Sequence, residues 1–457
     1  MQLLSVVAAV LICAWVVDGM ALASGAQRNI VLGLNPALQR SIKLGADLEA
    51  GAVNRGTSAA IGIGGKGQDV FIASHSQRCA DLPLLAQFLG AGPEGDALLA
   101  LLSGVAASVD DAERAALDLL TVRSSARLRN AITLLSPVSG EATEIVEPSG
   151  SVSPDEIEQL KAKLRATPAA PGVAVMGSMP PGCPAALYSE LLPLCTDRRS
   201  AVLLDIVGPT VVPTIAGLSS AASGAASGAA AGAAAGAGAE RRVDTVVLKV
   251  NIKELCAVAG MAGAAGGSDS SASRSGLLLA AAGALAEQIH AASGAGAAAG
   301  GAAAAAGAAA GGAAGGAAGV GAGETQVLVA ATDGAFFAHL LLLGGGRVLQ
   351  HVKYTLPALP RPLLNPIGAG DAVASGMLAA LTGKAGPLPV TGGAGAGAGP
   401  VLGRLTLAGG ADPVAAFRWG LACGAASCMT DANSVFARAD AEALFAGIGL
   451  QAAPTSE

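Results

Sequence analysis

The chain has 457 residues, of which 52% are hydrophobic, 2% aromatic and 13% charged, and its formal net charge is −6. About a quarter of the residues in a globular domain are charged, and the difference here comes from Ala and from 65 Gly that gather in long runs. The acidic balance argues against a nucleic-acid-binding face, which needs clustered Lys and Arg, and the lack of a three-residue glycine period excludes collagen.

The Ala/Gly runs lie at 218–239, 291–323 and 391–399. No residue larger than Ala supplies a face to bury there, and each interspersed Gly costs a helix about 1 kcal/mol. We therefore expect exposed, mostly disordered insertions, and the remaining chain is long enough for one large domain. The seven cysteines contain no C-x-x-C pair and are predicted to be reduced thiols, and the cysteines and histidines show no metal-ligand spacing.

The N-terminus carries an apolar run from Leu3 to Val17, followed by the small-residue sequence Ala21-Leu22-Ala23. The run is short for a membrane helix, which needs about 20 residues, and it resembles the core of a signal peptide. No Lys or Arg precedes it, so a cleaved signal, an anchor, an atypical targeting segment within 1–27 and a misassigned start all stay open. We expect no membrane association once this segment is processed.

From Arg28 onward short apolar runs alternate with amphipathic stretches. Strands are predicted at 29–34, 173–176, 201–206, 245–250 and 326–331. Helices are predicted at 66–79, 94–107, 154–165, 184–195, 252–259, 277–292, 368–382, 413–429 and 438–447. This alternation predicts an α/β fold with a parallel sheet and helices on both faces. Two regions rich in Thr, Arg and Ser, around 37–60 and 123–147, are predicted to form a small separate sheet.

The first candidate motif is the segment G-I-G-G-K-G-Q-D-V at 62–70. It matches the dinucleotide fingerprint formally, but a strand–turn region precedes it and Gln87 stands where an acid is expected. It is no Walker loop either, because Gly67 follows Lys66. Two interpretations remain: a flexible glycine pair at a helix start that approaches a polar substrate, or a plain loop in a Gly-rich protein.

The second candidate motif is K-V-N-I-K-E-L at 249–255, where a strand runs into a helix. The carboxyl ends of parallel strands are where α/β sheets bind ligands. Asn251 and Glu254 either cap the helix as a reciprocal pair or lie near a metal-bound phosphate.

The third candidate motif is Gly368-Ala369-Gly370-Asp371, directly before an apolar helix. Glycines at a helix N-terminus leave backbone N–H groups free to hold an anion. Asp371 is either a general base beside a phosphate site or an acid that simply favours the first turn.

Taken together and in order, the motifs resemble the ribokinase/PfkB family of carbohydrate kinases over essentially 28–450. The matching segments are L-N-P-A at 34–37, G-G-K-G at 64–67, G-S-M-P-P-G at 177–182, Asp205, N-x-x-E at 251–254, T-D-G-A at 332–335 and G-A-G-D at 368–371. The L-N-P-A opening is most similar to the branch that phosphorylates hexose phosphates, such as fructose 1-phosphate or tagatose 6-phosphate. The resemblance implies a three-layer α/β/α fold with a mostly parallel central sheet and a small β-sheet lid.

The resemblance also implies Mg²⁺-assisted phosphoryl transfer from ATP. Asp371 would act as the base, and the backbone at Gly368, Ala369 and Gly370 would stabilise the transferring phosphoryl group. The nucleotide side would be formed by Asn251, Glu254 (indirectly on Mg²⁺), Thr332, Asp333 and Gly334. The acceptor side would be formed by Asn35, Gln39, Gly64, Gly65, Lys66, Asp69 and Arg129. Arg129 is either a ligand for an acceptor phosphate or a solvated strand residue.

Several positions depart from the family pattern. Gln39 replaces a common Asp, and Asp69 replaces a common Asn, which disfavours a second anion nearby; Val250, Ala331 and Ala372 differ as well. The phosphoryl-transfer residues are kept, and the acceptor pocket is what has changed. The leading hypothesis is a kinase of a sugar or sugar phosphate, with a non-catalytic kinase-like scaffold and a nucleoside kinase as alternatives.

The same resemblance permits a homodimer formed through the lid, and it names no nucleic-acid partner. A secreted kinase would meet little ATP, so ATP dependence favours the cytoplasm or an organelle that contains ATP.

Overall fold

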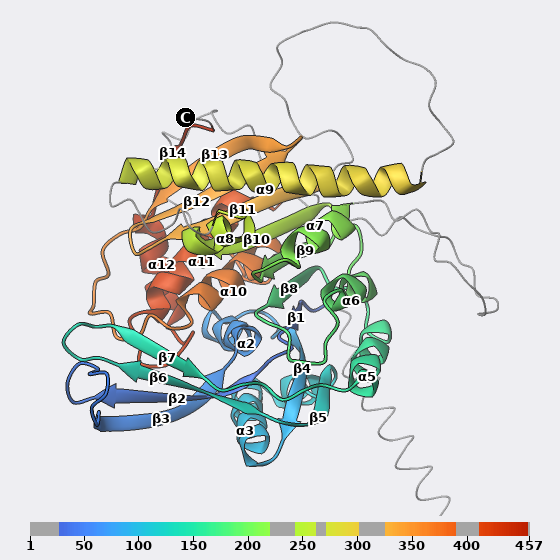
Figure 1. Ribbon diagram of the computed structural model, residues 1–457. Coiled ribbons are helices and arrows are strands. Elements are labelled where there is room, and N and C mark those ends of the chain that lie inside the picture. Colours follow the sequence, from blue (N-terminus) through green and yellow to red (C-terminus); the bar gives the residue numbers. More distant parts are fainter. Residues whose placement is uncertain (1–26, 220–242, 262–270, 301–324, 390–410, 456–457) are drawn as a thin grey trace, which may run out of the picture.

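The computed structural model describes residues 27–219, 243–261, 271–300, 325–389 and 411–455 (Figure 1). The N-terminal segment that was expected to be signal-like and most of the expected insertions lie outside these residues. Among the helices that are described, none combines the length and the apolar character needed to cross a bilayer.

A ten-stranded sheet forms the centre of the molecule, in the order β14-β13-β12-β11-β10-β9-β8-β1-β4-β5. Neighbours from β5 to β11 run parallel, and the edge strands β12 to β14 are antiparallel. The strands are β1 (Ile30–Leu32), β4 (Leu84–Ala91), β5 (Thr121–Arg127), β8 (Gly172–Met176), β9 (Ala201–Asp205), β10 (Thr245–Asn251), β11 (Gln326–Asp333), β12 (Phe337–Gly344), β13 (Arg347–Thr355) and β14 (Gly449–Ala452).

Helices cover both faces of this sheet, as the alternating pattern predicted (Figure 1). Along β9, Leu203 packs into one apolar core, whereas Val202 and Leu204 pack into the other. The first core is closed by α2 (Lys66–Ser76), α3 (Pro93–Ala107), α10 (Ala369–Leu381), α11 (Pro413–Ser427) and α12 (Arg438–Gly447). The second is closed by α4 (Asp111–Ala116), α5 (Pro154–Arg165), α6 (Leu187–Cys195), α7 (Val211–Ser219), α8 (Ile252–Val258) and α9 (Ser271–Gly300).

A separate four-stranded sheet, the lid, stands out from the central sheet beside α2 (Figure 1). Its order is β3-β2-β6-β7, with β2 at Ala37–Leu44, β3 at Gly56–Gly64, β6 at Arg129–Leu135 and β7 at Ala142–Val146. The predicted small sheet is thus confirmed, with one correction. Residues 123–127 belong to β5, which pairs with the buried strand β4 in the central sheet and not with the lid.

Two further corrections concern helices and strands. α9 continues to Gly300, so the beginning of the tract expected as an insertion from 291 is helical, because Ala favours helix strongly enough to extend it. Six elements were not predicted from the sequence: β4, β12, β13, β14, α4 and α7.

Close packing of α10 on α11 fixes the helix that carries Asp371. A Cβ added at Gly376 would lie 2.9 Å from the Cα of Gly420, and one added at Gly420 would lie 2.5 Å from the carbonyl oxygen of Val373. Only glycine fits at either contact, so the two helices approach each other backbone to backbone. α10 is thereby held rigidly behind the carboxyl ends of the strands.

Candidate active site

The N-terminus of α10 is an open cluster of backbone donors. Gly368 is the helix N-cap in a left-handed conformation with φ of 80°, and no side chain caps the helix. The N–H of Ala369 donates to the carbonyl oxygen of Pro366 at 3.3 Å, whereas the N–H groups of Gly370 and Asp371 find no acceptor in the described part of the chain. Free N–H groups at a helix N-terminus are suited to an anion.

Asp371 lies in the first turn of this helix and is 8% exposed. Its Oδ1 atom has no hydrogen-bond partner among the described residues. Burial and the charge of Asp205 raise the pKa of Asp371, Lys66 and Lys249 lower it, and the net effect is a pKa of about 7. A carboxyl group with such a pKa can exchange a proton near neutral pH.

Two lysines meet one carboxylate directly beside this helix. The Nζ of Lys66 lies 2.5 Å from Oδ1 of Asp205, and the Nζ of Lys249 lies 2.7 Å from Oδ2 of the same residue. Burial favours the neutral form of Asp205, but the two ammonium groups outweigh it and hold the pKa of Asp205 below its ordinary value. Burial opposes the charge on Lys66 too, yet Asp205, Asp371 and Glu254 raise the pKa of Lys66.

The sequence analysis did not assign Lys249 to the site. β9 and β10 are parallel neighbours with Leu204 opposite Leu248, which brings Asp205 and Lys249 to the same level at the carboxyl edge. A Cβ on Gly370 would lie 2.6 Å from the Nζ of Lys249, so this ammonium group reaches the backbone of the glycine motif. The position of Lys249 near the end of a predicted strand could have indicated a site residue. Its ion pair with Asp205, however, depends on the register between β9 and β10, which the sequence does not show.

On the acceptor side, Asn35 joins three segments that are far apart in the sequence. Its Nδ2 donates to Oγ of Ser178 at 3.1 Å, its Oδ1 accepts from Oγ of Ser149 at 2.8 Å, and its carbonyl oxygen accepts from Arg129 at 2.9 Å. The Nε of Arg129 is buried without a partner among the described residues. This unused donor supports the interpretation of Arg129 as an anion ligand.

The junction between the lid and α2 brings Gln39, Gly64 and Gly65 together. Gln39 is 3% exposed and its Nε2 donates to Oγ1 of Thr133 at 2.5 Å. A Cβ on Gly64 would lie 3.0 Å from Oε1 of Gln39. Gly65 has a φ of 105°, which favours glycine and turns the chain from β3 into α2. Asp69, in the first turn of α2, is 5% exposed.

A cavity of about 380 Å³ opens beside the glycine motif. Its walls are largely apolar and consist of Thr332, Gly334, Ala335, Phe336, Phe337, Leu356, Pro357, Ala358, Leu359, Leu363, Ala369, Gly370, Val373, Leu421, Gly424, Ala425 and Cys428. The predicted nucleotide-side residues Thr332 and Gly334 are therefore here. Asp333 is not among these lining residues, and its carboxylate pairs with Arg274 at 3.2 Å.

Asn251 and Glu254 form the reciprocal helix cap that the sequence left open as an alternative. Oδ1 of Asn251 accepts from the N–H of Glu254 at 2.9 Å, and Oε2 of Glu254 accepts from the N–H of Asn251 at 2.8 Å. The cap holds both side chains at the carboxyl end of β10, where Glu254 is close enough for its charge to influence Lys66. Within the described residues, no cluster of acids, histidines and cysteines forms a ready metal cage.

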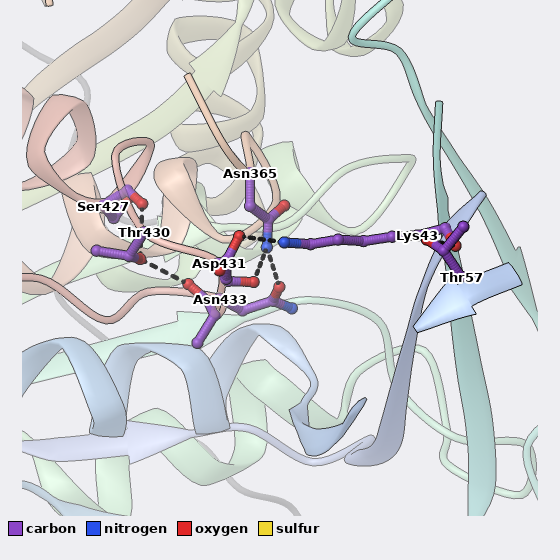
Figure 2. A network of polar contacts seen from close by, with 8 residues as sticks. Lys43, Thr57, Asn365, Ser427, Thr430, Asp431 and Asn433 are labelled. Carbon is purple, nitrogen blue, oxygen red and sulfur yellow. Dashed lines mark hydrogen bonds and ion pairs between the residues drawn. The ribbon is translucent and has the colours of Figure 1, made fainter. Parts of the chain in front are cut away.

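One ion pair connects the lid to the body of the protein (Figure 2). Lys43 of β2 reaches Asp431, in the loop after α11, with 2.7 Å between Nζ and Oδ1. Asn365 supports that loop, since its Nδ2 donates to the carbonyl oxygen of Asp431 at 3.2 Å and to Oδ1 of Asn433 at 2.9 Å. The lid is thus in contact with the loop that flanks the glycine motif.

Comparison with known proteins gives matches in sequence and in fold. No family model matches the chain. A stretch of 188 residues is 28% identical to 1-phosphofructokinase of Rhodobacter capsulatus, covering 40% of this chain and 54% of that protein, so the match spans about half of the relative.

Many solved structures share the fold, and two of them serve as examples. Phosphofructokinase-2 from Escherichia coli, determined in complex with substrates and products, has a TM-score of 0.57 at 17% identity and covers 92% of this chain and 99% of its own. Ribokinase from Arabidopsis thaliana, complexed with ribose and ATP, has a TM-score of 0.50 at 13% identity and covers 92% of this chain and 99% of its own. The fold is therefore ribokinase-like. In this fold and in the matching stretch of sequence, the chain is similar to the ribokinase/PfkB kinases.

Proposed function

We propose that the protein transfers the γ-phosphoryl group of ATP to a hydroxyl group of a sugar or sugar phosphate. The observation that carries this proposal is the position of Asp371. It is a buried carboxyl with a pKa of about 7, at a helix N-terminus with unused N–H groups and beside Lys66 and Lys249. A base, an anion site and positive charge are the parts that phosphoryl transfer requires.

In the proposed reaction, a carboxylate oxygen of Asp371 accepts the proton of the acceptor hydroxyl. The acceptor oxygen then forms a bond to the γ-phosphorus, the bond from that phosphorus to the bridging oxygen breaks, and ADP leaves with the electron pair. The N–H groups of Gly370 and Asp371 donate to the transferring group, and the two ammonium groups counter its negative charge.

On the nucleotide side, the nucleobase of ATP would occupy the apolar cavity. Its phosphates would then lie beside the glycine motif, because Ala369 and Gly370 line that cavity. Asn251 and Glu254 fit Mg²⁺ through water, since Glu254 uses only Oε2 in the helix cap within the described residues. Bound there, Mg²⁺ would neutralise phosphate charge.

For the acceptor, we propose a hexose phosphate or a related sugar. A protein with a similar stretch of sequence is a 1-phosphofructokinase, and the structure of phosphofructokinase-2 of E. coli has been solved in complex with fructose 6-phosphate. The unused Nε of Arg129 supports a phosphate on this side. The lid, turning at Gly65 and held by Lys43, would keep out water that competes as acceptor.

The outer face of the lid supports a homodimer. One row across the lid strands consists of Ile61, Arg40, Ile132 and Ile145, because Arg40 is paired with both Ile61 and Ile132, and Ile132 is paired with Ile145. Ile61 is 55% exposed and Ile145 is 52% exposed. Exposed isoleucines on one face of a sheet, with an arginine among them, are typical of an interface, and we propose that a second copy of the chain covers this row.

The proposed function is tested by replacing Asp371 with Asn and measuring ADP release with Mg-ATP and a panel of sugars, hexose phosphates and nucleosides. The amide cannot accept the proton, so we expect acceptor-dependent turnover to fall about a thousandfold while nucleotide binding, followed by calorimetry, persists. Asp96→Asn is the matched control, because Asp96 is an exposed carboxylate that pairs with Arg123 on the surface. An Asp371→Asn protein with undiminished turnover would exclude Asp371 as the base.

The same panel separates the two alternatives. Stimulation by nucleosides alone identifies a nucleoside kinase with the same chemistry. ATP binding without stimulation by any acceptor identifies a kinase-like scaffold.

A further inference from the structure

The loop after α11, residues 428–435, contacts both the lid and the glycine motif. On the side of the lid, Oδ1 of Asp431 lies 2.7 Å from Nζ of Lys43 (Figure 2). On the side of the motif, Oγ of Ser434 donates to the carbonyl oxygen of Gly368 at 2.9 Å. A single short loop therefore joins two parts of the site that come from distant stretches of the sequence.

The contact between this loop and the glycine motif is close. Ser434 is fully buried and has a φ of 56°, which is uncommon for a residue other than glycine. A Cβ added at Gly368 would lie 2.8 Å from the backbone nitrogen of Ser434. Because Gly368 is the N-cap of α10, a shift of Ser434 would also shift the unused N–H groups of Gly370 and Asp371.

Asn365 ties the tip of the same loop to the chain that enters the motif (Figure 2). It is fully buried, and its Nδ2 donates to the carbonyl oxygen of Asp431 and to Oδ1 of Asn433. Its Oδ1 accepts from the N–H of Ile367 at 2.9 Å. The backbone of Asp431 and the start of the motif therefore share one amide side chain, and neither can shift far without breaking its hydrogen bonds.

Lys43 meets this loop from far along the lid. The lid leaves the body where Ala37 pairs with Gly64, and Lys43 stands six residues further along β2, which is roughly 20 Å in an extended strand. A contact so far from the base limits the swing of the lid more than the same contact near the base would. The side chains of Lys43 and Asp431 are 48% and 61% exposed, and such an ion pair is weak enough to form and break reversibly.

We propose that the ion pair between Lys43 and Asp431 is a latch that couples closure of the lid to the position of the glycine motif. The inference rests on the proposed kinase function. When the lid closes, Lys43 binds Asp431, and the 428–435 loop then holds Gly368 in place through Asn365 and Ser434. Lys43 and Asp431 are positioning residues, because their ion pair acts on the anion site only through that loop. The anion site is thereby ordered when an acceptor is enclosed, which disfavours transfer of the phosphoryl group to water.

The kinetic test exchanges the two charges. ADP release, with and without the best acceptor of the panel, is compared for wild type, Lys43→Glu, Asp431→Lys and the protein that carries both substitutions. Each single substitution brings like charges together, so the KM for the acceptor should rise about fivefold and the share of ADP released without acceptor should increase, with a smaller change in kcat. The double variant restores an ion pair and should return both quantities to within about twofold of wild type.

Arg123→Glu is the matched control, because Arg123 and Asp96 form an ion pair of similar exposure outside the 428–435 loop. It should leave the KM for the acceptor and the acceptor-independent ADP release unchanged. Single variants that behave as wild type, or a double variant that is no better than the single ones, would overturn the proposal.

A second measurement needs no turnover. Hydrogen exchange of the full-length protein is followed by mass spectrometry in peptides that cover 365–371 and 428–435. Lys43→Glu should speed exchange in both peptides about threefold, and the double variant should restore it. Faster exchange confined to the lid strands would show that the ion pair holds the lid alone, and would overturn the coupling. If no acceptor is found, the kinase proposal fails while the exchange result still decides the coupling.

Discussion

The charges around Asp371 have opposite effects on its pKa, and the resulting pKa determines how the proposed reaction responds to pH. Only the ionised carboxylate can accept a proton, so with a pKa of about 7 the rate should fall as the pH drops below that value. We expect kcat/KM to reach a plateau above pH 7 and to lose about tenfold for each pH unit below it. The measurement is ADP release across pH 5 to 9 with saturating Mg-ATP.

Asp205→Asn gives a matched variant for this profile. Asp205 raises the pKa of Asp371, and its removal leaves the ammonium groups of Lys66 and Lys249 to lower that pKa. The acid limb should therefore move to lower pH, whatever the variant does to the maximal rate. An unmoved limb in a variant whose thermal unfolding shows a folded protein would contradict the assignment of the limb to Asp371.

Candidate site residues that lie in a local motif could be predicted from the sequence, whereas those brought to the site by strand register could not. Asp371 and its glycines were predicted because a helix start is local. Lys249 was missed because only the pairing of β9 with β10 brings it to Asp205. For Asp333, the ion pair with Arg274 links residues 59 positions apart, which no spacing rule shows.

Among the elements, the lid offers the clearest test, because its outer row of isoleucines is proposed to be an interface. Ile145→Lys would place a charge on the edge strand β7, at one end of that row, and should convert a dimer to monomers, measured by light scattering after size-exclusion chromatography. Val138→Lys is the control, since Val138 is 83% exposed in the turn between β6 and β7 and outside the row. A wild-type monomer, or an Ile145→Lys dimer, would contradict the proposed interface.

Whole helices and strands were predicted well where the residue pattern is strong. The helix predicted at 154–165 is α5, and the structure begins it with a capping box between Ser153 and Glu156. The assignment of 123–127 to the lid was wrong because an alternating strand of Thr, Arg and Ser looks the same in either sheet. What decides is the partner strand, β4, which the sequence analysis did not find.

Across the whole molecule, the C-terminal end is tied to the sheet through two stacked histidines. Nδ1 of His351 lies 2.7 Å from the carbonyl oxygen of Pro454, which can only accept, so this nitrogen carries the proton. Nε2 of His351 then accepts from Nδ1 of His339 at 2.9 Å. Burial, with smaller contributions from His351 and Lys353, lowers the pKa of His339 to about 3.

This arrangement predicts that the protein loses stability in acid. His339 is neutral in the folded chain down to about pH 3 and protonates near its ordinary value in the unfolded chain, so stability is complete above about pH 6.5 and falls as the pH drops below it. The loss should be roughly 1.4 kcal/mol per pH unit from this residue. Urea unfolding of wild type and His339→Gln between pH 7 and 4 measures it, and equal slopes for the two proteins would contradict the prediction.

The candidate site lies at the carboxyl edge of the central sheet, and this position bears on where the length of the chain can change during evolution. Asp205 and Lys249 lie at the carboxyl ends of β9 and β10, beside Asp371 at the start of α10, whereas residues 220–242 and 301–324 precede the amino ends of β10 and β11 in the sequence. Mutations that lengthen or shorten those Ala/Gly-rich stretches therefore enter the chain on the side remote from the chemistry. Selection for the activity should therefore constrain the length of these stretches only weakly. We expect related proteins to differ in length there far more than in the glycine motif.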